Sequence, residues 1–425
     1  MELLRYGARG TAVYYLQLAL IRAGYTDLAL DGVFGARTAE AVRDFQQKNG
    51  ISPDGAVGTR TWGKLYPYLK GYTTHIVKSG DTLFSLSQRY NTALYRILLA
   101  NPTVNPQNLQ VGTRVQIPFD FPLVPTDVPY SAVLTSWIIE GLSVRYPFLE
   151  NGSTGKSVMG KTISFLRIGT GEKEVFYNAS HHANEWLTTP VLLKFAEEYA
   201  NSYALGEKLG DVVAARLFRE YSLYLVPMVN PDGVDLVTEM LKSGAYYNRA
   251  RQISDAYPEI PFPNGWKANI VGVDLNLQYP ANWEEAKRIK FSQGFTTPAP
   301  RDFVGTAPLV APESFAMFTF TRTHNFLLTL SYHSQGEIIY WKYLDYEPAR
   351  SREIAEYFGE VSGYAVEETP YASGFAGYKD WFIETYDRPG YTIEIGRGAS
   401  PLPLSQFPEI YKDNFGILLG GMTQI

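Results

Sequence analysis

Residues 175–186 read VFYNASHHANEW, and they join a strand-like run to the start of a helical segment. Its first three residues form an apolar run typical of a buried strand, and a helical pattern follows at 188–199. Similar apolar runs, at 223–227, 327–331 and 391–395, alternate with helical segments along the rest of the chain. This alternation predicts a large α/β domain with a mostly parallel, mixed sheet covered by helices, and a site at the carboxyl ends of its strands.

His182 and Glu185 lie three positions apart in this stretch. On one helical turn, or on the loop that enters it, both side chains can face one point and bind one ion. Zinc in catalytic sites takes three protein ligands and leaves a fourth position for water, so a third ligand must come from elsewhere. Of the five His, His333 is the best third ligand because it follows the apolar run at 327–331. For a lone HxxE pattern, a solvated pair without metal is the alternative.

The composition excludes several classes of function. A length of 425 residues predicts two or three domains. Because the chain has no Cys, it has no thiolate nucleophile, thiolate ligand or disulfide, and any metal must be bound by His and carboxylate groups. A net charge of −5 speaks against nucleic acid as a partner, which needs a concentrated basic face. No apolar run is long enough to predict a membrane span, and the first residues lack the pattern of a signal peptide.

Two similar turns organise residues 1–70. Residues 31–35 read DGVFG and residues 54–58 read DGAVG, and in each turn a Gly permits the positive φ that a tight turn requires. We expect Thr38 and Thr61 to cap the helices that follow. The segment resembles a peptidoglycan-binding domain, also through residues 7–10 (GARG) and 16–17 (LQ). A three-helix bundle without a ligand is the alternative.

Residues 71–119 predict a strand, two helices and a second strand. Residues 75–83, HIVKSGDTL, are typical of a short strand, a turn and an Asp/Thr-capped helix start. An Asn-Pro pair at 101–102 ends the second helix, and residues 111–118 supply the closing strand. This β-α-α-β order resembles a LysM domain, which implies binding of glycans that contain N-acetylglucosamine.

A proline-rich segment follows these two modules. Residues 120–130 contain Pro122, Pro125 and Pro129, a composition that predicts a semi-rigid linker. The expected domains are a helical domain at 1–70, a LysM domain at 71–119 and the α/β domain at 131–425.

The α/β domain resembles the zinc carboxypeptidases of the carboxypeptidase A type. The motifs, in family order, are His182-x-x-Glu185, VNPDG at 229–233, GVDLN at 272–276, SYHS at 331–334 and YTIE at 391–394. The resemblance implies that His182, Glu185 and His333 bind one zinc ion and that Glu394 is the general base. Zinc lowers the pKa of its water and polarises the scissile carbonyl, while a carboxylate carries the proton to the leaving amine.

Glu394 lies on an apolar strand, so we expect burial to raise its proton affinity. The alternative for Glu394 is a structural ion pair.

Two departures from the family concern substrate binding. The family's exopeptidases have Asn-Arg where this chain has Asn276-Leu277, and a Leu cannot bind a terminal carboxylate through charged hydrogen bonds. Cleavage within a peptide is therefore favoured over release of C-terminal residues. Lys267 stands where related enzymes have an Arg that stabilises the oxyanion, and it can still supply positive charge.

Residues 371–380, YASGFAGYKD, resemble the family's specificity loop. The resemblance implies that Tyr371 is the mobile tyrosine that covers the substrate. Lys379 falls at the position that selects the side chain, where a cation suits a substrate with an extra carboxylate such as diaminopimelate. A surface lysine is the alternative for Lys379.

Together these features resemble the γ-D-glutamyl-diaminopimelate endopeptidases, which cut the peptidoglycan stem peptide between D-glutamate and diaminopimelate. The alternatives are a zinc carboxypeptidase, a zinc amidase acting at the lactyl-peptide junction, and a non-catalytic wall-binding protein. The expected partners are the wall glycan and its stem peptide, and the oligomeric state is left open. A bacterial protein without a visible leader is expected to stay in the cytoplasm, to act during sporulation, or to reach the wall by another route.

Overall fold

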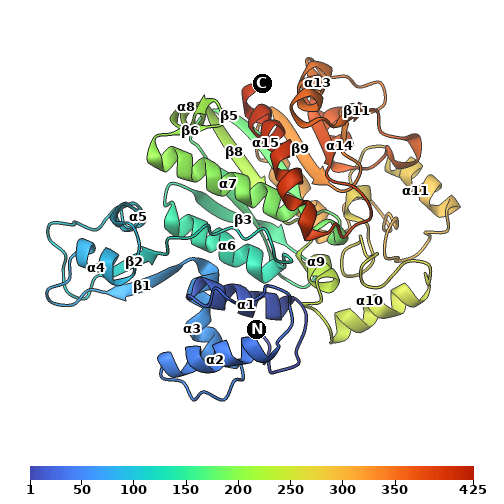
Figure 1. The fold of residues 1–425 in the computed structure, drawn as a ribbon. Coiled ribbons are helices and arrows are strands. Elements are labelled where there is room, and N and C mark those ends of the chain that lie inside the picture. Colours follow the sequence, from blue (N-terminus) through green and yellow to red (C-terminus); the bar gives the residue numbers. More distant parts are fainter. The chain divides into compact units, whose positions relative to one another are not determined.

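The computed structural model describes residues 1–425, and the chain divides into two compact units (Figure 1). One unit comprises Met1–Pro129 with Ser136–Glu150, and the other comprises Tyr130–Thr135 with Asn151–Ile425. The division falls within helix α6, Ala132–Arg145, which is the first helix after the proline-rich segment. This helix therefore contributes to both units.

The first 70 residues form three helices, α1 (Thr11–Arg22), α2 (Ala36–Lys48) and α3 (Thr59–Lys70). A buried glutamine holds each of the two similar turns in the same way. The amide of Gln17 donates to Asp31 at 2.7 Å and its Oε1 accepts the N–H of Gly32 at 2.8 Å. Gln46 makes the equivalent contacts with Asp54 and Gly55, both at 2.9 Å. The repeated turns of the sequence are thus one structural device used twice.

The prediction that Thr38 and Thr61 cap the following helices is wrong. The capping positions are Gly35 and Gly58, and neither helix has a side-chain cap. Both threonines lie inside the first helical turn, where Thr38 Oγ1 accepts a hydrogen bond from Gln17 and Thr61 Oγ1 accepts one from Gln46. The buried glutamines recruit the hydroxyls because an unpaired amide would cost free energy in the core.

The LysM module has the predicted β-α-α-β order. Its elements are β1 (Tyr72–Ile76), α4 (Leu83–Arg89), α5 (Leu94–Ala100) and β2 (Arg114–Pro118), and the two strands pair antiparallel. The expected capped helix start is confirmed, because Thr82 and Ser85 form a reciprocal capping box. His75 is buried and binds Asp81 at 2.8 Å, so it serves the module's own structure.

The proline-rich segment at 120–130 is packed rather than extended through solvent. Leu123 is fully buried. The guanidinium of Arg22 donates to the carbonyl oxygens of Pro122 and Leu123, at 2.9 and 2.8 Å. Because carbonyl oxygens that leave water need donors, these hydrogen bonds fix the path of the segment.

The large unit is built on an eight-stranded mixed sheet in the order β11-β10-β12-β9-β5-β8-β4-β3 (Figure 1). Its four central strands β12, β9, β5 and β8 are mutually parallel, while β10 and β4 run antiparallel to their neighbours β12 and β8. The strands are β3 (Glu150–Lys156), β4 (Thr162–Ile168), β5 (Lys173–Ala179), β8 (Tyr221–Val226), β9 (Leu328–His333), β10 (Ile338–Tyr340), β11 (Ala365–Glu367) and β12 (Gly390–Glu394). The α/β class with a mostly parallel sheet is confirmed.

Helices bury both faces of this sheet, as alternate residues of β5 illustrate. Phe176 stacks on Phe326 and packs edge-on against Tyr378, which belongs to α14. Tyr177 points to the other face, where its hydroxyl donates to the carbonyl of Leu418 in α15. Strands that are buried on both faces explain the continuous apolar runs of the sequence.

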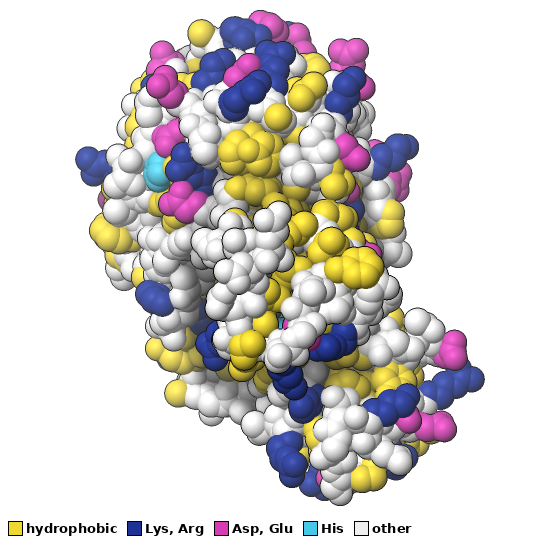
Figure 2. All heavy atoms as spheres, turned by 90° about the vertical axis from the view of Figure 1, so that its left-hand side faces the viewer, with side chains coloured by type: hydrophobic (Ala, Val, Ile, Leu, Met, Phe, Trp, Pro, Cys, Tyr) yellow, Lys and Arg dark blue, Asp and Glu magenta, His cyan; other side chains and the backbone are white.

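The remaining elements of the large unit are mostly helices. They are α7 (Thr188–Leu205), α8 (Ala214–Glu220), α9 (Pro231–Val237), α10 (Ala245–Asp255), α11 (Trp283–Ser292), α12 (Pro312–Arg322), α13 (Ser351–Ser362), α14 (Tyr378–Tyr386), α15 (Phe407–Thr423), and the short hairpin of β6 (Lys208–Leu209) and β7 (Val212–Val213). No helix has the length and apolar character needed to span a membrane. On the face shown in Figure 2, basic and acidic side chains are interspersed.

Replacing Gln46 by Ala is expected to loosen the helical module, because Asp54, Thr61 and the N–H of Gly55 all lose a buried partner. A loss of about 1–3 kcal/mol in the free energy of unfolding follows from the unsatisfied groups. Hydrogen exchange at the Gly55 amide in the full chain measures the effect. Gln47→Ala, on the exposed side of the same helix, is the control, and equal exchange in both variants contradicts the role of Gln46.

Candidate metal centre and active site

The candidate site lies where three neighbouring parallel strands end. His182 comes three residues after the end of β5 at Ala179, and a single 3-10 turn, Ala183–Glu185, carries Glu185. His333 is the last residue of β9, and Glu394 is the last residue of β12. Parallel pairing sets His333 directly beside Glu394. The topology therefore brings together side chains that are more than 200 residues apart in the sequence.

The three predicted ligands converge with their donor atoms facing one another. His182 Nδ1 lies 3.0 Å from Glu185 Oε1, and His333 Nδ1 lies 2.9 Å from Glu185 Oε2. The two Nδ1 atoms are 3.2 Å apart, and all three side chains are buried. Two imidazole nitrogens and a carboxylate form the donor set that zinc prefers, in the number that leaves a catalytic position open. The residues present thus fit a zinc ion.

Asp274 orients one of these histidines, a role that sequence reasoning did not assign. Its Oδ1 lies 3.2 Å from His182 Nε2, on the opposite side of the ring from Nδ1. A carboxylate behind the imidazole fixes the ring and makes the other nitrogen a better ligand. Asp274 stands inside the GVDLN motif, so the sequence contained a signal for it. The Asp alone, however, indicated nothing about which side chain it would contact.

Positive charge and a backbone donor compensate the buried Glu185. Lys267 Nζ lies 2.9 Å from Glu185 Oε1, and the N–H of Ser334 donates to Oε2 at 3.2 Å. Burial alone would raise the pKa of Glu185, but His182 and Lys267 hold it well below its ordinary value. The carboxylate is therefore kept ionised, as a metal ligand must be.

The surroundings of Glu394 shift its pKa in the opposite direction to that of Glu185. It is half-buried beside His333 and lines the same pocket. Burial raises the pKa of Glu394 to about 8, the charge of Glu185 adds to this rise, and Lys267 and His182 act against it. The pKa values of these two neighbouring carboxyl groups are therefore shifted in opposite directions. Such a difference is expected where one carboxyl group stays ionised and the other transfers protons. The direction agrees with the rise expected from the position of Glu394 on an apolar strand.

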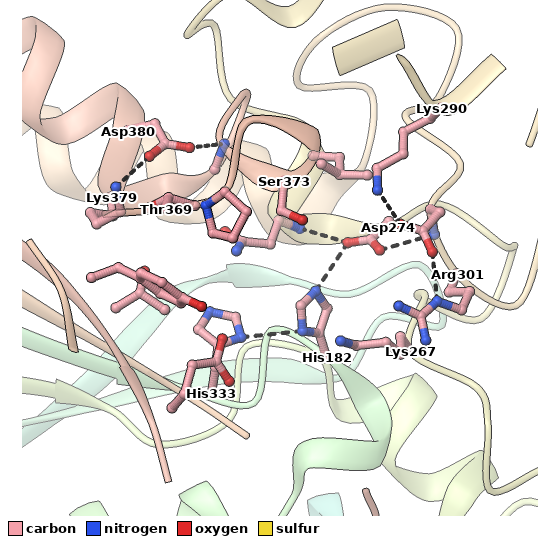
Figure 3. Close-up of a pocket in the computed structure, with 18 residues that line it drawn as sticks. His182, Lys267, Asp274, Lys290, Arg301, His333, Thr369, Ser373, Lys379 and Asp380 are labelled. Carbon is pink, nitrogen blue, oxygen red and sulfur yellow. Dashed lines mark hydrogen bonds and ion pairs between the residues drawn. The ribbon is translucent and has the colours of Figure 1, made fainter. Parts of the chain in front are cut away.

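A pocket opens in front of these groups (Figure 3). Asn276, Leu277 and Lys379 line it together with Lys267, Glu394 and the two histidines. Asn276 Oδ1 accepts the N–H of Tyr378, while Leu277 is 7% exposed and presents only apolar surface. A terminal carboxylate would find no cation at Leu277.

Lys379 is not the surface lysine that the sequence left as an alternative. It is 4% exposed, and its Nζ lies 2.6 Å from Asp380 Oδ1 and donates to the carbonyl of Lys342 at 2.8 Å. Figure 3 shows this pair on one side of His182, with Lys267 and Arg301 on the other. The pocket wall here carries both signs of charge.

Tyr371 lies beside the pocket and is not among its lining residues. Its side chain is 63% exposed, and its hydroxyl donates to Glu285 on α11 at 2.6 Å. Thr369, Pro370 and Ser373 of the same loop do line the pocket. The loop thus reaches the site, while the role of Tyr371 as a cover for the substrate stays a prediction.

Comparison with known protein families agrees with this geometry. Residues 135–416 match the zinc carboxypeptidase family, residues 9–65 match a putative peptidoglycan binding domain, and residues 75–118 match a LysM domain. The structure of thrombin activatable fibrinolysis inhibitor has the same fold, with a TM-score of 0.55, 16% identity, and coverage of 84% of this chain and 98% of that one.

Two bacterial relatives are more similar in sequence. The chain is 40% identical to γ-D-glutamyl-L-diamino acid endopeptidase 1 of Lysinibacillus sphaericus, over 82% of this chain and 99% of the relative. It is 43% identical to the protein YqgT of Bacillus subtilis strain 168, over 64% of this chain and 72% of the relative. The family match and the similarity to these relatives, together with the fold and the candidate ligands, show that the chain belongs to the zinc carboxypeptidase family.

Proposed function

We propose that this protein is a zinc metallopeptidase that hydrolyses the γ-D-glutamyl-diaminopimelate bond of peptidoglycan stem peptides. One pocket carries the proposal, because it joins two of the candidate zinc ligands, His182 and His333, and the groups for hydrolysis to Leu277, which offers no anchor for a chain end. The identity to an endopeptidase of that name, over 99% of its length, supports the same substrate.

In this proposal His182, Glu185 and His333 hold zinc, which supplies an activated water and polarises the scissile carbonyl. Glu394, which lines the same pocket, accepts a proton from the attacking water and returns it to the leaving amine. Lys267 Nζ, already 2.9 Å from Glu185, places positive charge where the oxyanion develops.

The side-chain end of meso-diaminopimelate carries both an ammonium and a carboxylate group. The buried pair of Lys379 and Asp380 presents complementary charges from the pocket wall. We propose that the pair binds this zwitterion, with Lys379 facing the carboxylate and Asp380 facing the ammonium. Asn276, whose Oδ1 is already held by the Tyr378 N–H, is left to donate its Nδ2 hydrogens to the substrate.

The two small modules bind the cell wall in this proposal, with boundaries at 1–70 and 71–119, a connecting segment at 120–130 and catalysis at 131–425. Their matches to wall-binding families support this role. Attachment to an insoluble substrate raises the local concentration of stem peptides around the catalytic pocket, so that weak binding by each module suffices.

Analysis of the reaction products distinguishes three alternative functions. A zinc carboxypeptidase would release the C-terminal residue, an amidase would cut at the lactyl-peptide junction, and a wall-binding protein without catalysis would release nothing. No feature of the pocket favours any of them over the endopeptidase, and Leu277 counts against the first.

The zinc-loaded protein is expected to convert L-Ala-γ-D-Glu-meso-diaminopimelate-D-Ala into L-Ala-D-Glu and a diaminopimelate fragment. Glu394→Gln, which is nearly the same size but cannot accept the proton, is expected to lower kcat by about 10²–10⁴-fold. Mass spectrometry of the products measures both. Release of D-Ala with an intact γ-glutamyl bond would show a carboxypeptidase instead.

Removal of zinc by a chelator is expected to abolish activity and to lower the melting temperature, because the ion binds only the folded site. Zinc at a thousandfold excess over its Kd stabilises by about 4 kcal/mol. His333→Ala is expected to lose both the bound zinc and the zinc-dependent rise in melting temperature. His324→Ala, whose histidine pairs with Glu174 outside the site, keeps both, and an equal loss in the two variants argues against the ligand assignment.

Lys379→Met is expected to lower kcat/KM for the diaminopimelate peptide at least about tenfold more than for the corresponding L-lysine peptide, which lacks the second carboxylate. Steady-state kinetics on the two peptides measures the difference. Lys342→Met is the control, because Lys342 pairs with Glu368 and its backbone carbonyl still accepts from Lys379. An equal fall for both peptides contradicts binding of the zwitterion by Lys379.

A further inference from the structure

A second cation, Arg301, stands next to Lys267 at the candidate site (Figure 3). Both side chains line the pocket in front of His182 and His333, and both also line an adjoining hollow that includes Asn184, Gln335 and Ser400. Glu394 also borders both spaces. The two cations thus lie at the junction between the two spaces. A peptide that occupied both spaces would have its scissile bond at this junction.

These two cations are engaged differently. Lys267 Nζ is held by the candidate zinc ligand Glu185. Arg301 hydrogen-bonds to Asp302 through Nε at 2.5 Å, which leaves its two terminal NH2 groups for a ligand, and its side chain is 44% exposed. A guanidinium with two parallel donors is suited to a carboxylate in a way that an ammonium is not.

A chain of ion pairs and hydrogen bonds fixes the position of Arg301 relative to the candidate metal ligand His182. Asp302 binds Lys290 at 2.6 Å in addition to Arg301, so this group of three carries one net positive charge. The N–H of Asp302 donates to Asp274 Oδ2 at 3.1 Å, and Asp274 Oδ1 contacts His182. Asp302 itself adopts a positive φ of 63°, an uncommon conformation for a residue with a side chain. Such a fixed chain of contacts is what a substrate-binding group requires.

The substrate of the proposed function has a matching group, and this inference rests on that function. A glutamyl residue linked through its γ-carboxyl keeps a free α-carboxylate on the amino side of the scissile bond. Four C–C bonds separate the two carboxyl carbons, a span of roughly 5 Å. In the proposed function, diaminopimelate binds at the Lys379–Asp380 pair, so the α-carboxylate lies on the opposite side of the junction. Figure 3 shows Arg301 on that opposite side. An ordinary α-linked peptide has no charge at this point.

We infer that Arg301 binds the α-carboxylate of the γ-linked glutamyl residue and so makes the enzyme select γ-glutamyl bonds whose α-carboxylate is free. Arg301 is then a specificity residue, while Lys267 serves the oxyanion. Peptides in which this carboxylate is amidated, as in D-isoglutamine, leave the guanidinium without a charged partner and are poor substrates.

The test compares two peptides that differ only at this group, L-Ala-γ-D-Glu-meso-diaminopimelate-D-Ala and its α-amide. The wild type is expected to prefer the carboxylate peptide by at least about tenfold in kcat/KM. Arg301→Gln is expected to remove this preference, mainly through a higher KM for the carboxylate peptide, with little change for the amide. Arg352→Gln, an exposed arginine whose Nε also binds a carboxylate, keeps the wild-type preference.

Other results overturn the inference. Equal loss on both peptides in Arg301→Gln would assign Arg301 to the oxyanion, and equal cleavage of both peptides by the wild type would show that the carboxylate is not recognised. If Arg301→Gln melts below the assay temperature, Arg301→Lys decides, with a preference at least about threefold below wild type expected from loss of the planar fork. A wild type that leaves both γ-glutamyl bonds intact contradicts the proposed function, whatever the variants do.

Discussion

The parallel pairing of β5, β9 and β12 is the constraint on which the site depends. Parallel strands end at the same edge of a sheet, so residues far apart in the chain arrive at one place. The register that sets His333 beside Glu394 also fixes the distance from both to the turn that carries His182 and Glu185. A slip of one residue would turn these side chains to the opposite face, where α15 packs.

Buried charge is the second organising feature. Glu185 lies between two imidazoles, an ammonium group and a backbone N–H, so its ionised form is well compensated without any ion. Asp274 extends this network to His182 and to the backbone of Asp302. Buried charges that share partners tolerate the loss of one member poorly, and such a network therefore holds its geometry. Here that rigidity serves ligands and substrate-binding groups alike.

Much of this arrangement followed from the sequence alone. Apolar runs predicted the central strands, and the end of one run led to His333. The HxxE spacing indicated His182 and Glu185, whereas Glu394 was implied by the resemblance to the zinc carboxypeptidases. The repeated DG turns predicted similar structures, but the prediction for Thr38 and Thr61 was wrong, because a cap is a local pattern whereas the buried glutamines that bind these hydroxyls lie on the preceding helix. Periodicity carries no information about such partners.

Loop residues were the least predictable for the same reason. Arg301 and Asp302 belong to no periodic element, and their importance appears only when the loop is seen against Asp274. The pairing of Lys379 with Asp380 was hidden because adjacent residues of a helix do not usually face each other, and only the backbone carbonyl of Lys342 fixes the lysine in this direction. The sequence indicated charge at this position but not its neutralisation.

Leu277 has a consequence for the kind of polymer the pocket can accept. A buried cation at this point would be stabilised only by a free chain terminus, and any continuing chain would leave it desolvated and unpaired, at a cost of several kcal/mol. The apolar side chain removes that penalty, because an amide-linked continuation passes it without stranding a charge. At this position the enzyme is therefore indifferent to whether its substrate is an end or an interior segment of a network.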